Sequence, residues 1–286
     1  MNDFYTILTA SLVAINCALM GGFLMMRKMV MIGDAISHAV LPGIFMAYYI
    51  SGSTASLPIL VGAAFSGILA TLMIEWFTKK ARLQSDAAIG VSYTLLFAIG
   101  IILISKWGQN ADLDQQCVLY GEIEQISFWL QPVAFGIVLP KQTIILLAVA
   151  VLLIGAVIWG YKGLFITTFD PDFALSTGVA VTFWHYFLMS GVSLTTVVSF
   201  ESVGAILVIA FLSGPPAIAY LLTEDFKKML VLACLIGILC SIGGYYSAKW
   251  LDVSVAGAIS TFIGLVFLVV FIGTSVLKRK VDVIST

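Results

Sequence analysis

The chain has 286 residues, of which 61% are hydrophobic and 10% charged, with a formal net charge of -1 and a mean hydropathy of +1.09. Soluble domains carry roughly 25% charged residues, so this composition excludes a soluble globular protein. The net charge gives no indication of a nucleic-acid partner, and no polar stretch is long enough to form a separate soluble domain. We therefore expect residues 1–286 to form a single all-α, polytopic membrane domain surrounded by lipid.

Apolar stretches long enough to cross a membrane recur along the chain. Crossing roughly 30 Å of hydrocarbon takes about 20 helical residues. Such stretches lie at 4–26, 33–51, 57–78, 87–105, 141–161, 179–199, 203–222, 229–248 and 254–277. They predict about nine transmembrane helices. Eight spans, or a re-entrant segment, remain an alternative because almost no loop separates the two stretches that meet near 199–203.

The basic residues predict how these helices are oriented. With nine spans, one side of the membrane receives Arg27, Lys28, Lys79, Lys80, Arg82, Lys162, Lys227, Lys228, Lys278, Arg279 and Lys280. The other side receives only Lys106, Lys141 and Lys249. The positive-inside rule therefore predicts that the N-terminus is outside and the C-terminus is in the cytoplasm.

The longest outer connection, Lys106–Pro140, is acidic. It contains Asp112, Asp114, Glu122 and Glu124. These residues are either a solvated loop or an entrance surface for a cation, or for a protein that delivers one.

The longest inner connection contains the sequence FDPDFALSTG and predicts a short cytoplasmic helix near 169–178. Asp170 can cap this helix, Pro171 suits its first turn, Asp172 favours the positive end of its dipole, and Gly178 can end it. Because the chain has no G-x-x-x-x-G-K-[ST] loop, any nucleotide hydrolysis must occur on another subunit.

Apolar side chains accompany this predicted helix. Phe169, Phe173 and Leu175 either pack on their own bundle or offer a partner a surface to hold.

A proline pair interrupts one of the later spans. Pro215 and Pro216 lie within 203–222 and are expected to break or kink it. Broken helices often line cavities, whereas the alternative is a tolerated kink among ordinary packing glycines.

Asp34 and His38 are two ionisable residues within an apolar predicted span, where burying charged groups costs free energy. Because they are four residues apart, both side chains lie on one face of a helix. A helical rise of about 10 Å from Arg27–Lys28 to Asp34, and of about 16 Å to His38, puts both residues near the middle of the membrane. Three interpretations stay open: a structural hydrogen bond, a proton relay, or a stopping point for a metal ion. A carboxylate with a neutral imidazole suits Mn(II), Fe(II) or Zn(II). His185 stands among aromatic residues and is expected to be a hydrogen-bonded core histidine.

At these residues the chain resembles a known family. GDAISHAVLPG resembles the signature of the permease subunits of bacterial metal-ion (manganese, iron or zinc) ABC importers, the ABC-3 type metal permeases. The resemblance extends to SDAAIGVSYTLLFAIGIILIS, DLDQQCVLYG, FDPDFALSTG and the small-residue C-terminal spans. This chain differs from the usual pattern at Glu201, where the family commonly has a basic or neutral residue, and at Pro215–Pro216, where it has a single proline followed by alanines.

The resemblance implies a transport subunit of the bacterial inner membrane that is not itself an enzyme and holds no permanent cofactor. It implies that Asp34 and His38 coordinate the transported metal and that Phe169, Asp170, Pro171, Asp172, Phe173, Ala174 and Gly178 form the element that couples to a separate ATPase. The other implied partners are an extracytoplasmic metal-binding protein and a second permease chain, either another copy of this chain or a related subunit.

Two further expectations concern selectivity and gating. The form SHAVLPG is closer to the manganese and iron branch than to the zinc branch, which remains the alternative. Candidate entrance or gate residues are Asp112, Asp114, Glu201, Pro215 and Pro216. A function of another class, an autonomous proton-coupled carrier, also stays open.

Overall fold

The structure is a computed structural model that describes residues 2–51, 56–107, 130–132 and 138–284. Its helices are α1 (Asn2–Met26), α2 (Met31–Ala39), α3 (Leu41–Ser51), α4 (Ser56–Lys80), α5 (Ser85–Trp107), α7 (Lys141–Phe169), α8 (Pro171–Ser176), α9 (Val181–Val203), α10 (Ala205–Leu222), α11 (Phe226–Leu251) and α12 (Val255–Ile284). A short antiparallel hairpin, β1 (Leu130–Pro132) with β2 (Val138–Pro140), supplies the only strands among the described residues.

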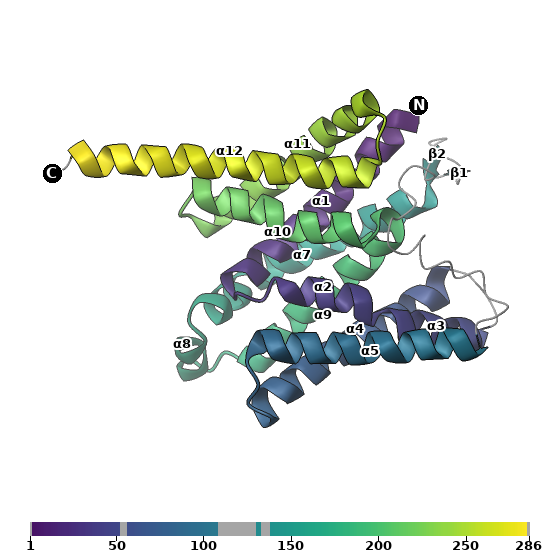
Figure 1. The fold of residues 1–286 in the computed structure, drawn as a ribbon. Coiled ribbons are helices and arrows are strands. Elements are labelled where there is room, and N and C mark those ends of the chain that lie inside the picture. The colour runs from purple at the N-terminus through teal and green to yellow at the C-terminus, as the bar shows by residue number, and fades with distance from the viewer. Residues whose placement is uncertain (1, 52–55, 108–129, 133–137, 285–286) are drawn as a thin grey trace.

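Nine segments of the described residues are long and apolar enough to cross a membrane, with α2 and α3 together forming one of them. This confirms the predicted number of spans. The chain runs back and forth between two ends of the bundle: the N-terminus and the hairpin lie at one end, and α8 and the C-terminus lie at the other (Figure 1).

A single glycine separates α9 from α10, which explains why the sequence left the count ambiguous here. Gly204 has φ +79°, a conformation that residues with a Cβ rarely adopt, and its amide donates to the Phe200 carbonyl at 3.0 Å. The turn therefore needs no loop, and each flanking helix still qualifies as a span.

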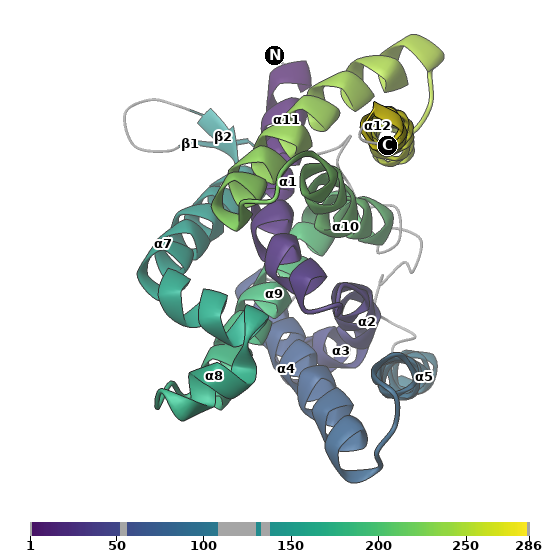
Figure 2. The same cartoon turned by 90° about the vertical axis from the view of Figure 1, so that its left-hand side faces the viewer.

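Helix α1 is at the centre of one group of helices and packs against α7, α9, α10 and α11 (Figure 2). Two buried polar contacts join α1 to α7: the Thr9 and Thr143 hydroxyls lie 2.8 Å apart, and Asn16 Nδ2 donates to the Leu146 carbonyl at 3.2 Å. Helices α2 to α5 form a second group, which α9 links to the first.

The apolar stretch 33–51 suggested one continuous helix, but the second span is divided into two helices. It consists of α2 and α3, which meet at Val40. Pro42 has no N–H to donate to the carbonyl of His38, so the regular ladder is interrupted directly after the histidine.

The expected break at the second proline position is absent. Helix α10 continues through Pro215 and Pro216, and both are buried. The prolines remove the usual donors to the Phe211 and Leu212 carbonyls without ending the helix. The Leu212 carbonyl faces Gly21 of α1. A Cβ added to Gly21 would lie 2.0 Å from the Leu212 carbonyl oxygen.

Candidate metal site

Asp34 and His38 lie on one face of α2, as their spacing predicts. His38 Nε2 and Asp34 Oδ1 are 3.4 Å apart, and the two side chains are 27% and 25% exposed. Both are therefore half-buried groups that another ligand or a second chain can still reach. A carboxylate oxygen and an imidazole nitrogen at this separation can turn toward one ion.

Aromatic rings from α5 hold the imidazole in place. The ring of His38 lies 5.9 Å from Tyr93 and 5.7 Å from Phe97, measured between centroids, with the Phe97 contact edge-on. Because Tyr93 and Phe97 are four residues apart, they present one face of α5 to the histidine. Tyr93 and Phe97 could not be recognised from the sequence, because nothing near them in the chain pairs them with α2.

The interruption after α2 favours a cation at this point. His38 lies in the last turn of α2, where the helix dipole is negative. Broken membrane helices commonly place such ends at ion sites. The Ala39 carbonyl is satisfied by the Ser66 hydroxyl of α4, which donates to it at 2.5 Å, so the end of α2 is tied to a neighbouring helix.

Helix α10 reaches the site through Leu212. A Cβ added to Gly33, directly before Asp34, would fall 2.0 Å from Leu212 Cδ2. The same residue turns its freed carbonyl toward Gly21 of α1. Leu212 therefore occupies a notch made by two glycines, and its position fixes how closely α2 can approach α10.

Two ligating side chains are too few to hold an ion tightly. Among the described residues no group of three or more His, Cys, Asp or Glu side chains could hold a metal. Further ligands must come from water, backbone or a second chain.

The predicted cytoplasmic helix is present as α8. Asp170 is its N-cap, and its Oδ1 accepts a hydrogen bond from the Phe173 amide at 2.9 Å. Pro171 is the first helical residue, Ala174 is fully buried, and Gly178 follows the helix with φ +77°.

The apolar residues at α8 divide into two kinds. The ring of Phe169 lies 4.7 Å from Phe165 and 5.3 Å from Phe226, so it packs on its own bundle. Phe173 and Leu175 are 53% and 62% exposed. Phe169 is itself 49% exposed, so all three side chains leave apolar surface available to a partner, and Phe169 differs in also contacting two rings of its own bundle.

The structure describes three of the five candidate entrance and gate residues. Asp112 and Asp114, with Glu122 and Glu124, lie outside the described residues. Glu201 is exposed two residues before the end of α9, and Pro215 and Pro216 are buried inside α10.

Comparison with known proteins identifies the family. The ABC 3 transport family matches residues 4–274. The chain is 44% identical over 271 residues to the manganese transport system membrane protein MntD of Bacillus subtilis, covering 94% of this chain and 91% of that protein. It is 39% identical to the zinc transport system membrane protein TroD of Treponema pallidum, covering 93% and 72%.

A solved structure shows the same arrangement of helices. PsaBC from Streptococcus pneumoniae, determined in complex with a Fab, superposes with a TM-score of 0.77 at 32% identity, over 93% of this chain and 90% of the matched chain. Sequence and fold agree along almost the whole length. The chain is a member of the ABC 3 transport family.

Proposed function

We propose that this chain is the membrane permease of an ATP-driven importer of divalent transition metal ions, with Mn(II) or Fe(II) favoured as the substrate. The observation that carries the proposal is the Asp34–His38 pair at the end of an interrupted membrane helix. It places an oxygen and a nitrogen ligand inside an otherwise apolar span, where ionisable groups mark ion pathways.

The ligand count argues for a shared site. One chain supplies a single carboxylate and a single imidazole, and a second permease chain related by a two-fold axis would supply the same pair again. Four ligands of this kind suit Mn(II), Fe(II) or Zn(II). A site assembled between chains also loses its ligands when the chains move apart, which allows release.

The choice of metal rests on the relatives as well as the ligands. The relative at 44% identity is named for manganese and the one at 39% for zinc, so manganese is favoured and zinc is the alternative. An oxygen and nitrogen set without thiolate accommodates either ion.

The energy for transport would come from a separate ATPase that binds α8. This helix stands at the end of the bundle that the basic residues assign to the cytoplasm, and it exposes Phe173 and Leu175. In this arrangement the N-terminus faces outward and the chain resides in the bacterial cytoplasmic membrane, where an extracytoplasmic metal-binding protein delivers the ion. Membership of an ABC family favours this coupling over an autonomous proton-coupled carrier.

Reconstitution tests the proposal. Proteoliposomes that contain the permease, a partner ABC ATPase and a metal-binding protein should accumulate Mn(II) only when ATP is supplied to the ATPase. Equal uptake by the permease alone, driven by a pH gradient, would contradict it and favour the carrier.

A further inference from the structure

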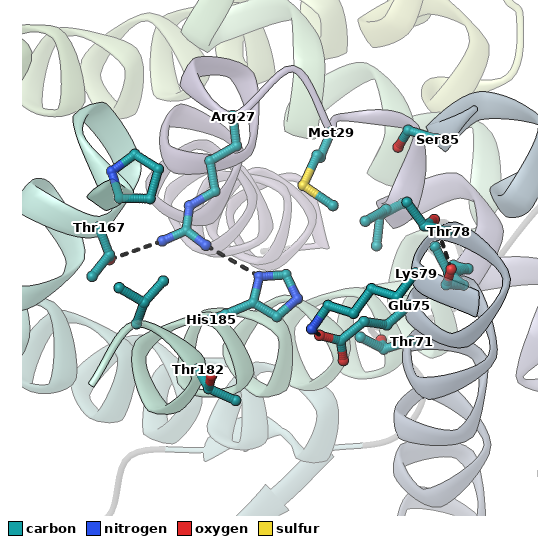
Figure 3. A pocket seen from close by; sticks show the side chains of 14 residues that line it. Arg27, Met29, Thr71, Glu75, Thr78, Lys79, Ser85, Thr167, Thr182 and His185 are labelled. Carbon is teal, nitrogen blue, oxygen red and sulfur yellow. Dashed lines mark hydrogen bonds and ion pairs between the residues drawn. The ribbon is translucent and has the colours of Figure 1, made fainter. Parts of the chain in front are cut away.

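A cavity that contains several charged and polar side chains lies at the end of the bundle that holds α8. It has a volume of ≈ 340 Å³ and is lined by the α1–α2 connection and by residues of α2, α4, α5, α7, α8 and α9 (Figure 3). Ile32 of α2 lines it, and this residue points about 200° around the helix from Asp34. The cavity is therefore distinct from the candidate metal site.

Arg27 is the fixed cation of this cavity. Its Nε donates to the Thr168 hydroxyl at 3.0 Å, its Nη2 to the Thr167 hydroxyl at 3.1 Å, and its Nη1 to His185 Nδ1 at 3.3 Å. A guanidinium has five N–H donors, so these bonds use three of them. All three acceptors are neutral, and none of the ion pairs among the described residues includes Arg27.

The charge of Arg27 is thus buried in part without a counter-ion. Burial lowers the pKa of the guanidinium to about 10, which still leaves it protonated at neutral pH. A half-buried charge with no opposite charge beside it is costly, and an anion in the cavity would remove that cost.

His185 adds a donor to the same space. Because arginine can only donate, Nδ1 of His185 accepts and the proton of the neutral ring lies on Nε2. The histidine is hydrogen-bonded, as expected from the sequence, yet it lines a cavity instead of a core. Figure 3 shows it between Arg27 and the Lys79–Glu75 pair.

The remaining lining groups leave donors in excess. Glu75 is the one acid that lines the cavity, and its two oxygens are taken by Lys79 and Tyr186. The Thr71 and Thr78 hydroxyls donate to carbonyls of their own helix. Arg27, His185 and the hydroxyls of Thr182 and Ser85 remain to donate to a ligand, and Lys79 adds a second cation to the lining.

We propose that this cavity binds a phosphate-type oxyanion through Arg27, His185 and Thr182. Arginine binds such anions through paired N–H groups, and basic pockets between membrane helices on the cytoplasmic side bind lipid headgroups. The anion is either the headgroup phosphate of an anionic phospholipid or free phosphate. Pro171 lines the same cavity, so an occupied site touches the first residue of α8.

Thermal unfolding of the purified permease tests this in two arms. In detergent, inorganic phosphate is titrated against chloride at constant ionic strength. In phosphatidylcholine nanodiscs, phosphatidylglycerol is either included or omitted. We expect a saturable rise in Tm on the order of 2–4 °C in at least one arm. A rise only with phosphatidylglycerol assigns the headgroup, and a rise with inorganic phosphate assigns the free anion.

Three variants make the test specific. Arg27→Gln should abolish the rise, whereas Lys80→Gln, which removes one exposed charge from the last turn of α4, should keep it. Arg27→Lys keeps the charge and loses the planar fork, so it should weaken binding several-fold even if Arg27→Gln does not fold. Native mass spectrometry of the wild type should retain phosphatidylglycerol over phosphatidylcholine if the headgroup is the ligand. No saturable rise in either arm, or an equal rise in both Arg27 variants, would overturn the proposal.

Discussion

The two histidines of this chain lie in polar sites with opposite electrostatic character. His38 is paired with Asp34 on its own helix, 3.4 Å away, at the negative end of α2. His185 accepts a hydrogen bond from Arg27, 158 residues away in the sequence, in a cavity where donors exceed acceptors. The ring is the same in both places, and its partner decides whether the site suits a cation or an anion.

The two sites also differ in whether one chain is enough to complete them. The Asp34–His38 pair is a short-range feature of one helix, completed by a second copy of the same helix in the proposed dimer. The Arg27 cavity is completed within one chain, because the α1–α2 connection, α7 and α9 each contribute a member of its hydrogen-bond network.

The largest effect should distinguish the two histidines directly. We expect His38→Gln or Asp34→Asn to lower ATP-driven Mn(II) uptake by more than about 100-fold, because each removes a proposed ligand. His185→Gln should leave Mn(II) binding intact, since His185 lies in the Arg27 cavity and is not a proposed ligand of the metal. Comparable loss of binding in the His38 and His185 variants would contradict the separation.

A second prediction concerns the seat of Asp34. In Gly33→Ala the new Cβ would meet Leu212, and overpacking of this kind costs about 1–3 kcal/mol. We expect the KM for Mn(II) to rise about tenfold, and Leu212→Ala in the same chain to restore it in part. Gly90→Ala is the matched control, because a Cβ there meets nothing within 4 Å. Loss of stability without a change in KM would show that Leu212 does not position Asp34.

A third prediction concerns the two phenylalanines at α8. Phe173→Ala should reduce association with the ATPase about tenfold and leave Tm nearly unchanged, because its ring is 53% exposed and none of the ring contacts among the described residues includes it. Phe169→Ala should instead lower the unfolding free energy by about 1 kcal/mol, since its ring packs on Phe165 and Phe226. A pull-down and a thermal melt on both variants check this, and reversed roles would refute the proposed docking surface.

The smallest predicted effect concerns the end of α2. Ser66→Ala removes the donor to the Ala39 carbonyl and should cost about 1 kcal/mol of stability. Thr94→Ala removes an exposed bond within α5 and should change stability by no more than about 0.5 kcal/mol. Equal effects in a denaturation series would mean that the α2–α3 junction is not held by Ser66.

Local signals predicted the features that depend on a few neighbouring residues. Hydropathy located the nine spans found among the described residues, and the Asp170–Pro171 pair predicted α8 with its cap. The interruption after His38 could also have been recognised from Pro42, which removes one helical donor. The same rule applied to Pro215 and Pro216 overstated the effect, because a helix inside a packed bundle can tolerate the loss of two donors.

Contacts between distant segments were not predictable in this way. Nothing near Arg27 in the sequence indicates Thr167, Thr168 or His185, and nothing near His38 indicates Tyr93 or Phe97. Those partners are set by how the helices pack, which periodicity and composition do not determine.

Binding of Mn(II) to the purified permease tests the central claim most directly. The loss of the free Mn(II) signal in electron paramagnetic resonance gives the number of ions bound per chain. We predict one ion for each pair of chains in the wild type, and loss of that ion in Asp34→Asn with the dimer intact. Undiminished binding in Asp34→Asn would contradict the assignment of Asp34 and His38 as ligands of the transported metal.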